Sequence, residues 1–354
     1  SKKYPMKAVL ANNWFDIGHE DKYYNSKLEV RAREFNHITI DKNRGILKKT
    51  SDDKDKFIGE IKWYLKLPAD VEYVRPRIFD YSTSYVNPYV SMEYYAYHTV
   101  HELFLYGDLT LQQWIDIFNR IRFVCDDFKR YTVKDTNIHS ALEEMYLTKT
   151  LQRFEKMKKD GRFLAFFESP IEVNGKKYLP LNEIIIALEK AIPEMLYDVD
   201  TFNIIHGDLC FANIMVDSNF SFIKVIDPRG KFGTYDIFGD FRYELAKLFH
   251  SVDGKYDFII KDLFDLDYNS ERACINYRIQ DRKREFNLYK VFLSTFAAEI
   301  DSDLKKIELI EALLFLSMIP LHGESIRHQM VMLGTGLEIL NRVIDIQIGE
   351  KKNV

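Results

Sequence analysis

One short segment in the second half of the chain sets two carboxylates and a carboxamide in a fixed order. Residues 206–213 read His-Gly-Asp-Leu-Cys-Phe-Ala-Asn, and Asp227 follows at the end of a further apolar run. The apolar runs of strand length cover residues 203–205, 213–216 and 222–226. Short strands of this kind would hold Asp208, Asn213 and Asp227 at their ends or in the loops between them. The chain is therefore expected to fold around a site built from these three side chains.

The three residue types suit the transfer of a phosphoryl group. Such a group carries dispersed negative charge, and proteins mostly position it and neutralise it with Mg²⁺. Because Mg²⁺ prefers hard oxygen ligands in octahedral geometry, Asn213 and Asp227 are the candidate metal ligands. Asp208 is the candidate catalytic residue, since it would orient an acceptor hydroxyl and accept its proton. The alternative is that both segments are ordinary turns.

The same segment carries a resemblance to a known family. The His-Gly-Asp-x₄-Asn pattern, followed by a strand that ends in Ile-Asp, resembles the aminoglycoside phosphotransferase and choline kinase family of small-molecule kinases. Gly207 favours this family over the protein kinases, which have Arg there. The chain resembles more closely the phosphotransferase-family proteins of bacterial capsule and surface-polysaccharide biosynthesis. The matching motifs lie at residues 60–64, 92–95, 206–211 and 226–230, within a resemblance that covers roughly 12–345.

The resemblance implies a fold class and a set of partners. The expected fold is α+β and bilobal, protein-kinase-like, with a small antiparallel-sheet N-lobe and a larger, mostly helical C-lobe. The expected cofactor is Mg²⁺ with ATP or GTP as phosphoryl donor, and the expected partners are this nucleotide and a small-molecule hydroxyl acceptor. A Walker A loop is absent from the sequence.

Composition bounds the class of protein. The chain has 354 residues, of which 46% are hydrophobic, which is enough for two lobes with buried cores. Its net charge of −4 has interspersed signs, so neither a nucleic-acid partner nor a membrane surface is predicted. The apolar run 312–321 is too short to cross a bilayer and contains Pro320. With no signal peptide and three widely spaced cysteines, a cytoplasmic protein is expected.

The first third of the sequence has the pattern of the small lobe. Strands, a turn and a helix alternate in the order strand, strand, helix, strand, strand. The expected strands are 35–40, 46–50, 78–81 and 89–95; the turn is 41–45, and the helix is 54–66, closed by Pro68. Farther along the chain, helical spacing predicts helices at 98–106, 111–130, 138–159 and 181–197.

The resemblance places the nucleotide-phosphate lysine at Lys49, near the end of the second strand. Glu60, at the edge of the apolar face of the following helix, is its expected ion-pair partner. Lys48 is the competing candidate, because neighbouring strand residues point to opposite faces and alternation alone does not decide between them. Glu93 and Tyr94 end the last strand of this lobe and are expected to form the hinge that meets the nucleotide base. No glycine-rich loop precedes Lys49.

Beyond Asp227 the candidates for acceptor binding are weaker. Arg229 could bind an anionic acceptor or a phosphate, or could close a surface turn. Asp240 could contact the acceptor or cap the helix that begins at 241. His322, Glu324 and Arg327 cluster just after Pro320 and are further acceptor-site candidates.

The remaining histidines are expected to have structural roles. His98 and His101 have a spacing that could bind a metal from one helix face, but no third ligand is evident, so ordinary roles are favoured. His206 is expected to organise the backbone of the catalytic segment near Asp227.

The domain boundaries follow from these assignments. Residues 1–30 resemble the closing segment of a nucleotidyltransferase domain, so they are expected to be a remnant arm, or the mark of an excised domain with a nucleotidyltransferase partner. The N-lobe is expected at 31–95 and the C-lobe at 96–354, with the catalytic segment at 204–230.

The expected activity is a Mg²⁺-dependent kinase that phosphorylates a hydroxyl of a sugar, polyol or amino alcohol, for surface-polysaccharide precursors. The alternative is a catalytically inactive nucleotide-binding scaffold with the same fold. A protein kinase is disfavoured, because no A-P-E element and no activation loop follow Asp227.

Overall fold

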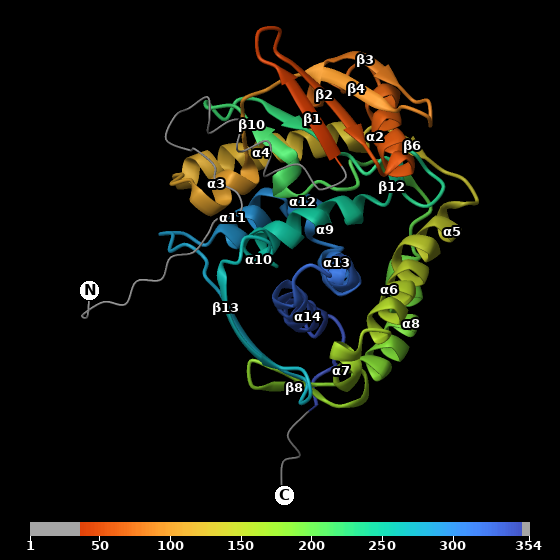
Figure 1. Ribbon diagram of the computed structural model, residues 1–354, viewed down its shortest axis with the longest axis vertical. Helices are drawn as coiled ribbons and strands as arrows, with labels where there is room; N and C mark the ends of the chain where they lie inside the picture. Colours follow the sequence, from red (N-terminus) through yellow and green to blue (C-terminus); the bar gives the residue numbers. More distant parts are fainter. Residues whose placement is uncertain (1–35, 349–354) are drawn as a thin grey trace, which may run out of the picture. The chain divides into compact units, whose positions relative to one another are not determined.

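The computed structural model describes residues 36–348, so the expected arm at 1–30 lies outside the described residues. The chain forms two compact units. In the described part, the smaller unit contains residues 36–58 and 77–94, and the larger contains 59–76 and 95–348. Each unit is described by itself below (Figure 1).

The smaller unit is a four-stranded antiparallel sheet in the order β1-β2-β4-β3. Its strands are β1 (Asn36–Asp41), β2 (Ile46–Ser51), β3 (Ile78–Ser82) and β4 (Tyr89–Glu93). The turn between β1 and β2 ends at Gly45, whose φ of +64° is a conformation that glycine adopts without strain. All four predicted strands are therefore confirmed, as is the hairpin between the first two.

Helix α2 (Lys54–Lys66) has the predicted bounds. Its apolar face includes Phe57, Ile61 and Tyr64, which are buried. The division between the two compact units falls inside this helix, between Ile58 and Gly59.

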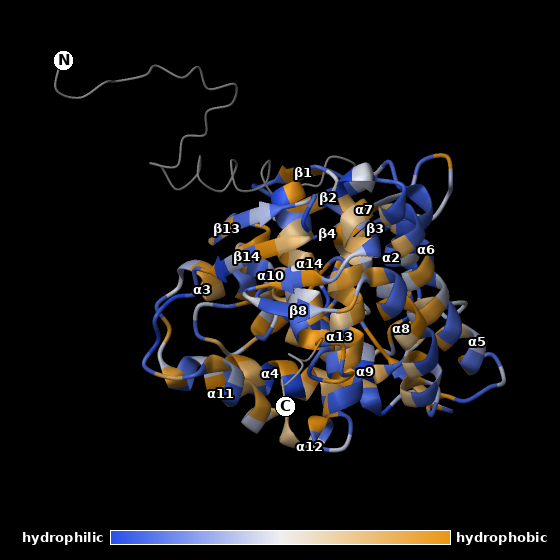
Figure 2. Cartoon of the chain, turned by 90° about the horizontal axis from the view of Figure 1, so that it is seen from below, coloured by the Kyte–Doolittle hydropathy of each residue, from blue (hydrophilic) through white to orange (hydrophobic). Residues whose placement is uncertain are grey.

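The larger unit is mostly helical. Helices α3 (Val100–Tyr106) and α4 (Leu111–Lys129) begin with capping boxes formed by Thr99 with Glu102 and by Thr110 with Gln113. The other long helices are α8 (Leu181–Leu196), α9 (Phe241–Val252), α13 (Leu304–Met318) and α14 (Ile326–Leu340). Helix α13 packs against α14, α9 and α6 (Lys149–Lys158), and its middle turns are buried (Figure 1). Figure 2 shows the hydrophobic colouring of these central helices.

Two small antiparallel sheets hold the catalytic segment. The first has the order β11-β10-β5 and the second β12-β9-β6. Their strands are β5 (His98–Thr99), β6 (Thr132–Val133), β9 (Phe202–Ile204), β10 (Ile214–Val216), β11 (Ile223–Val225) and β12 (Phe238–Gly239). The three apolar runs around the catalytic segment are therefore the strands that the sequence predicts.

The helix expected at 138–159 is confirmed as one unbroken helical stretch, but its middle departs from α-helical geometry. It consists of α5 (Ile138–Leu142), a π-helix, η2 (Glu143–Thr148), and α6. A π-helical stretch adds a residue to the turn and changes which side chains share a face, and it is frequent at functional sites.

A further sheet in the larger unit is not among the expected elements. It has the order β13-β14-β7-β8 and consists of β7 (Ile171–Val173), β8 (Lys176–Tyr178), β13 (Phe264–Asn269) and β14 (Cys274–Ile279). Short helices also lie outside the predictions: α7 (Leu164–Glu168), α10 (Tyr256–Ile259), α11 (Leu288–Thr295) and α12 (Ala297–Ile300).

Within residues 36–348, no helix combines the length and the apolar content that crossing a membrane would need. The three cysteines, Cys125, Cys210 and Cys274, are free thiols.

Candidate active site

The segment between β9 and β10 forms a tight loop that ends in a 3₁₀ turn, η4 (Phe211–Asn213). Gly207 has a φ of +75°, and a Cβ atom there would lie 2.9 Å from Cβ of Arg229. Both facts require glycine at this position. The backbone of Arg229 closes the other side of the loop, because its N–H donates to the carbonyl of His206 at 2.9 Å.

Asp208 and Asn213 lie together, as their spacing predicts. The Asn213 amide nitrogen donates to the Asp208 carboxylate at 3.0 Å and to the Asp208 carbonyl at 2.8 Å. With the nitrogen so engaged, the amide oxygen of Asn213 is the atom left to face a cation. A carboxamide oxygen beside a carboxylate is a donor set that suits Mg²⁺.

Asp227 is tied to the same loop through the backbone. The Ile226 N–H donates to the Asn213 carbonyl at 3.0 Å, and the Asp227 N–H donates to the hydroxyl of Tyr64 at 3.0 Å. Asp227 has a φ of +56°, a strained conformation for a residue with a side chain. The Asp227 side chain is exposed. Burial, followed by the neighbouring Glu60 and Asp227 carboxylates, raises the pKa of Tyr64 well above its usual value, so its hydroxyl stays neutral.

His206 organises the loop, as the sequence suggests. Its ring is buried against Trp63, and Nε2 donates to the Ile226 carbonyl at 2.9 Å. Nδ1 accepts the N–H of Asp208 at 3.3 Å. These partners require a neutral ring with its proton on Nε2. Burial lowers the pKa of His206 to about 4, which agrees with this assignment.

Glu244 on α9 accepts hydrogen bonds from the backbone of the catalytic loop. Its two carboxylate oxygens accept the N–H groups of His206 at 2.7 Å and Gly207 at 2.9 Å. Burial raises the pKa of Glu244 to about 7, although the two N–H donors and Lys247 pull it down. The catalytic loop is therefore shaped by a side chain from a later helix.

Two further residues of α9 reach the same loop. Lys247 forms an ion pair of 2.8 Å with the Asp208 carboxylate. Burial disfavours the ammonium of Lys247, but the Asp208 carboxylate outweighs this effect and raises the pKa of the lysine. Ser251 accepts the N–H of Phe211 at 3.2 Å. Glu244, Lys247 and Ser251 therefore form one polar stripe along α9 at helical spacing.

The opposed titrations of Glu244 and His206 predict a measurable pH dependence of stability. The pKa of Glu244 is 4.5 without perturbation and about 7 in the fold. Its titration therefore adds to the free energy of unfolding below pH 4.5, and this addition is lost as the pH rises to 7. The pKa of His206 falls from 6.5 to about 4, so its contribution is present above pH 6.5 and is lost as pH falls to 4. Each of these two groups contributes about 3 kcal/mol to the free energy of unfolding in its own pH range.

In Glu244→Gln, the loss of unfolding free energy relative to wild type is therefore expected to be about 3 kcal/mol larger at pH 4.5 than at pH 8. Urea unfolding of the wild type and the variant at both pH values measures this loss. The exposed Glu155→Gln variant is the matched control and should show no such difference. A Glu244→Gln loss that is equal at both pH values would contradict the buried titration.

In the smaller unit, the structure separates the two candidate lysines. Lys49 is buried, with 3% of its surface exposed, and its ammonium lies 5.6 Å from the centre of the Phe57 ring. Lys48 points to the exposed face, over the Tyr89 ring. Glu60, in the larger unit, is also buried. The ion pair of Lys49 with Glu60 stays a prediction.

The hinge candidates end the sheet of the smaller unit. The N–H of Glu93 donates to the Arg77 carbonyl and the N–H of Tyr94 donates to the Gly45 carbonyl, both at 2.8 Å. These two backbone N–H groups therefore form hydrogen bonds within the smaller unit, at the end of its sheet. Contact of Glu93 and Tyr94 with a nucleotide base stays a prediction.

Arg229 and Asp240 have different surroundings. Arg229 lies over the loop, and its guanidinium donates to the Tyr243 hydroxyl at 3.0 Å. Asp240 is buried, caps α9 through the N–H of Arg242, and forms an ion pair with the guanidinium of the same residue. It also accepts from the Tyr146 hydroxyl at 2.8 Å. Asp240 is therefore the N-cap of α9, which is one of the two roles that the sequence suggests for it.

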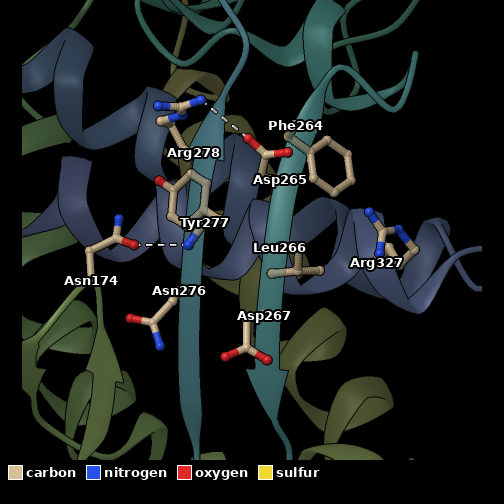
Figure 3. A pocket seen from close by; sticks show the side chains of 9 residues that line it. All are labelled: Asn174, Phe264, Asp265, Leu266, Asp267, Asn276, Tyr277, Arg278 and Arg327. Atoms are coloured by element: carbon tan, nitrogen blue, oxygen red, sulfur yellow. Dashed lines mark hydrogen bonds and ion pairs between the residues drawn. The ribbon is translucent and has the colours of Figure 1, made fainter.

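The cluster after Pro320 divides into two parts. His322 and Glu324 are joined at 2.9 Å, and with His328 they bring possible metal-ligand atoms within 4.8 Å of one another. Arg327 instead stacks over Phe264 and lines an open groove of about 560 Å³ along the β13–β14 hairpin (Figure 3). His101 is buried and hydrogen-bonds Asp257, and His98 pairs with Glu102.

Sequence reasoning missed Glu244, Lys247 and Tyr64. The only available indication was spacing: polar residues recur at three- and four-residue intervals on α9, a helix that is otherwise buried and apolar. Lys149 and Arg153, at the start of α6, were also missed.

No protein-family model and no curated protein sequence matches the chain. Solved structures do resemble it. A thermostable mutant of the aminoglycoside phosphotransferase APH(4)-Ia, in its apo form, superposes with a TM-score of 0.53 at 13% identity, covering 88% of this chain and 92% of that one. A variant in ternary complex with AMP-PNP and hygromycin B gives 0.52 at 12% identity, covering 88% and 91%. Another, with ADP and hygromycin B, gives 0.53 at 13% identity, covering 91% and 98%. The expected fold class is confirmed: this chain has the α+β kinase-like fold of the aminoglycoside phosphotransferases.

Proposed function

We propose that the protein is a Mg²⁺-dependent phosphotransferase that moves the γ-phosphate of ATP or GTP to a hydroxyl of a small molecule. The observation that carries this proposal is the assembly of Asp208, Asn213 and Asp227 on one hydrogen-bonded loop system within the larger unit. The fold supports it, because solved structures of the same fold hold AMP-PNP or ADP with an aminoglycoside.

In this proposal each residue has one task. Asp208 orients the acceptor hydroxyl and takes its proton as the phosphoryl group is transferred. The Asn213 amide oxygen and the Asp227 carboxylate hold Mg²⁺, which supplies positive charge to the nucleotide phosphates. Lys247, paired with Asp208, fixes the carboxylate and adds positive charge beside the reacting oxygens. His206 and Glu244 keep the loop in shape and remain outside the chemistry.

The nucleotide side of the proposal rests on residues of the smaller unit and on Glu60 of the larger one. Lys49 is the residue assigned to the nucleotide phosphates, since it is the buried lysine of β2. Glu60 is assigned as its partner, and Glu93 and Tyr94 as the segment that meets the base. A sugar, polyol or amino alcohol is the proposed acceptor class. The connection to surface-polysaccharide precursors, in the cytoplasm, rests on the sequence resemblance.

The test is a panel of hydroxyl acceptors with ATP and with GTP, read out by ADP or GDP release and by mass spectrometry of the product. Release that depends on both Mg²⁺ and an acceptor would support the proposal. Nucleotide binding without turnover on any acceptor would favour a catalytically inactive nucleotide-binding protein instead.

Replacing Asp227 by Ala is expected to abolish the gain in nucleotide affinity that Mg²⁺ provides, because a metal ligand is lost while the phosphate contacts of the chain remain. Calorimetric titration of ADP with and without Mg²⁺ measures this gain. The exposed Asp301→Ala variant is the control and should keep it. Retention of the full Mg²⁺ effect in Asp227→Ala would remove this residue from the metal site.

A further inference from the structure

Beside Asp208 the larger unit gathers more positive charge than its own carboxylates balance. Lys149 and Arg153 lie one helical turn apart on α6, directly after the π-helix η2, so their side chains share one face. Arg229 reaches the same region, because its guanidinium lies 3.8 Å from the sulfur of Met145 on η2. Arg229 also packs directly on Gly207, the residue before Asp208.

Within residues 36–348, none of these three side chains forms an ion pair with a carboxylate. In the described part of the chain, the Arg229 guanidinium donates to three neutral groups, namely the Lys231 carbonyl, the Tyr243 hydroxyl and the Met145 sulfur. The side chains of Lys149 and Arg153 have no hydrogen bond or ion pair anywhere in residues 36–348. By contrast, two other basic residues of this region are paired with carboxylates: Lys247 with Asp208, and Arg242 with Asp240.

The charges repel one another. Burial lowers the pKa of Lys149 well below its usual value, and Arg229, Lys247 and Arg153 lower it further. The opposing attraction comes from Asp208, whose carboxylate Lys247 already contacts. Burial, followed by Arg229, also lowers the pKa of Arg153. An arrangement of this kind is relieved when an anion enters it.

We propose that the acceptor is itself an anion: a hydroxyl compound that carries a phosphate ester or a carboxylate, held by Lys149, Arg153 and Arg229 with its hydroxyl at Asp208. This inference rests on the proposed function and names its substrate class. Arginine and lysine supply the charge-assisted hydrogen bonds that oxyanions accept, and the planar arginine fork can bind them in a bidentate manner. A polycationic acceptor would instead meet like charge at the same place.

The transfer step balances with these groups alone. The acceptor oxygen forms a bond to the γ-phosphorus as the bond from that phosphorus to the β–γ bridging oxygen breaks. The hydroxyl proton passes to the Asp208 carboxylate, and the nucleoside diphosphate leaves with the bridging oxygen. The anionic group of the acceptor takes no part in bond making, so it serves for binding and orientation.

The experiment compares three acceptor classes on the full chain with Mg²⁺ and ATP. The anionic class contains glycerol 3-phosphate, glucose 6-phosphate, gluconate and glucuronate; the neutral class contains glycerol, ribitol and glucose; the cationic class contains glucosamine and hygromycin B. The expected order of kcat/KM is anionic, then neutral, then cationic. The phosphate and carboxylate members show which oxyanion the cluster prefers.

Single variants then test the residues. Arg153→Gln and Lys149→Gln are each expected to raise KM for anionic acceptors by about tenfold to a hundredfold, as the loss of one charge-assisted hydrogen bond implies. KM for neutral acceptors and for ATP should stay unchanged. Arg153→Lys should recover part of the loss. Lys156→Gln, an exposed lysine on the same helix, is the matched control and should have no effect.

The outcomes separate the two proposals. Phosphorylation of a neutral or cationic acceptor in preference to the anionic ones, with KM unaffected by Arg153→Gln, would overturn the anionic acceptor and leave the phosphotransferase intact. A rise in KM for ATP alone would assign the cluster to the nucleotide and would also overturn it. Failure of every class to be phosphorylated would refute the proposed function itself.

Discussion

Asp208→Asn is expected to lower turnover by about 10²–10⁴-fold, the range that a positioned general base contributes. The amide has the size and shape of the carboxylate, so the hydrogen bond with Asn213 can be kept while the proton acceptor is lost. Nucleotide affinity should change little, because the residues assigned to the metal and the phosphates remain. Acceptor-dependent ADP release and calorimetric ADP binding measure the two quantities separately.

The variant needs a stability control, because it leaves Lys247 without its carboxylate. Removing one partner of a buried ion pair costs about 3–5 kcal/mol, whereas replacing both is often neutral. The double variant Asp208→Asn/Lys247→Met is therefore expected to regain stability in thermal unfolding and to stay inactive. Turnover within about tenfold of wild type in folded Asp208→Asn would show that Asp208 is not the base.

Gly230→Ala is expected to lower the stability of the fold strongly through its effect on the backbone. Gly230 has a φ of +66°, and an added Cβ would meet the Gly59 carbonyl and lie 2.7 Å from the N–H nitrogen of Glu60. Both neighbours are backbone atoms of α2, which cannot rotate away. A left-handed conformation costs about 1 kcal/mol, and the overlap adds a cost typical of overpacking, about 1–3 kcal/mol. Activity should fall as well, because the same backbone carries Asp227 and Arg229.

Two other glycines separate these contributions. Gly45 has a φ of +64° and open space around its Cα, so Gly45→Ala should show the conformational cost alone. Gly161 has ordinary φ and open space, so Gly161→Ala should be neutral or slightly stabilising. Urea unfolding of the three variants should rank Gly230 far above Gly45 and Gly161. Equal effects at Gly230 and Gly45 would show that α2 yields to the added methyl group.

The sequence was most informative where function constrains neighbouring residues. The spacing of Asp208 and Asn213 and the apolar runs around them indicated a loop between short strands, and the structure joins these side chains by a hydrogen bond. The hairpin of β1 and β2 and the helix α2 followed from turn chemistry and apolar periodicity, which are local properties.

The residues that support the site were less accessible for a physical reason. Glu244 and Lys247 lie almost forty positions beyond the loop they contact, and only the packing of α9 brings them there. The three- and four-residue spacing of polar residues on α9 does not by itself distinguish a buried glutamate or lysine from a solvated one. Likewise, Lys149 and Arg153 share a face with each other through the α-helical spacing of α6, but their place beside the residues of the catalytic loop follows from packing after a π-helix that no periodicity predicted.

The polar stripe of α9 also protects the backbone amides of the catalytic loop from hydrogen exchange with solvent. The amide hydrogens of His206, Gly207 and Phe211 are held by side chains of α9 and not by a strand. If they exchange with solvent deuterium through separation of α9 from the loop, all three should give the same free energy of opening. The reactive conformation and the docking of α9 are thus a single cooperative event: a molecule in which this helix has opened has also lost its site.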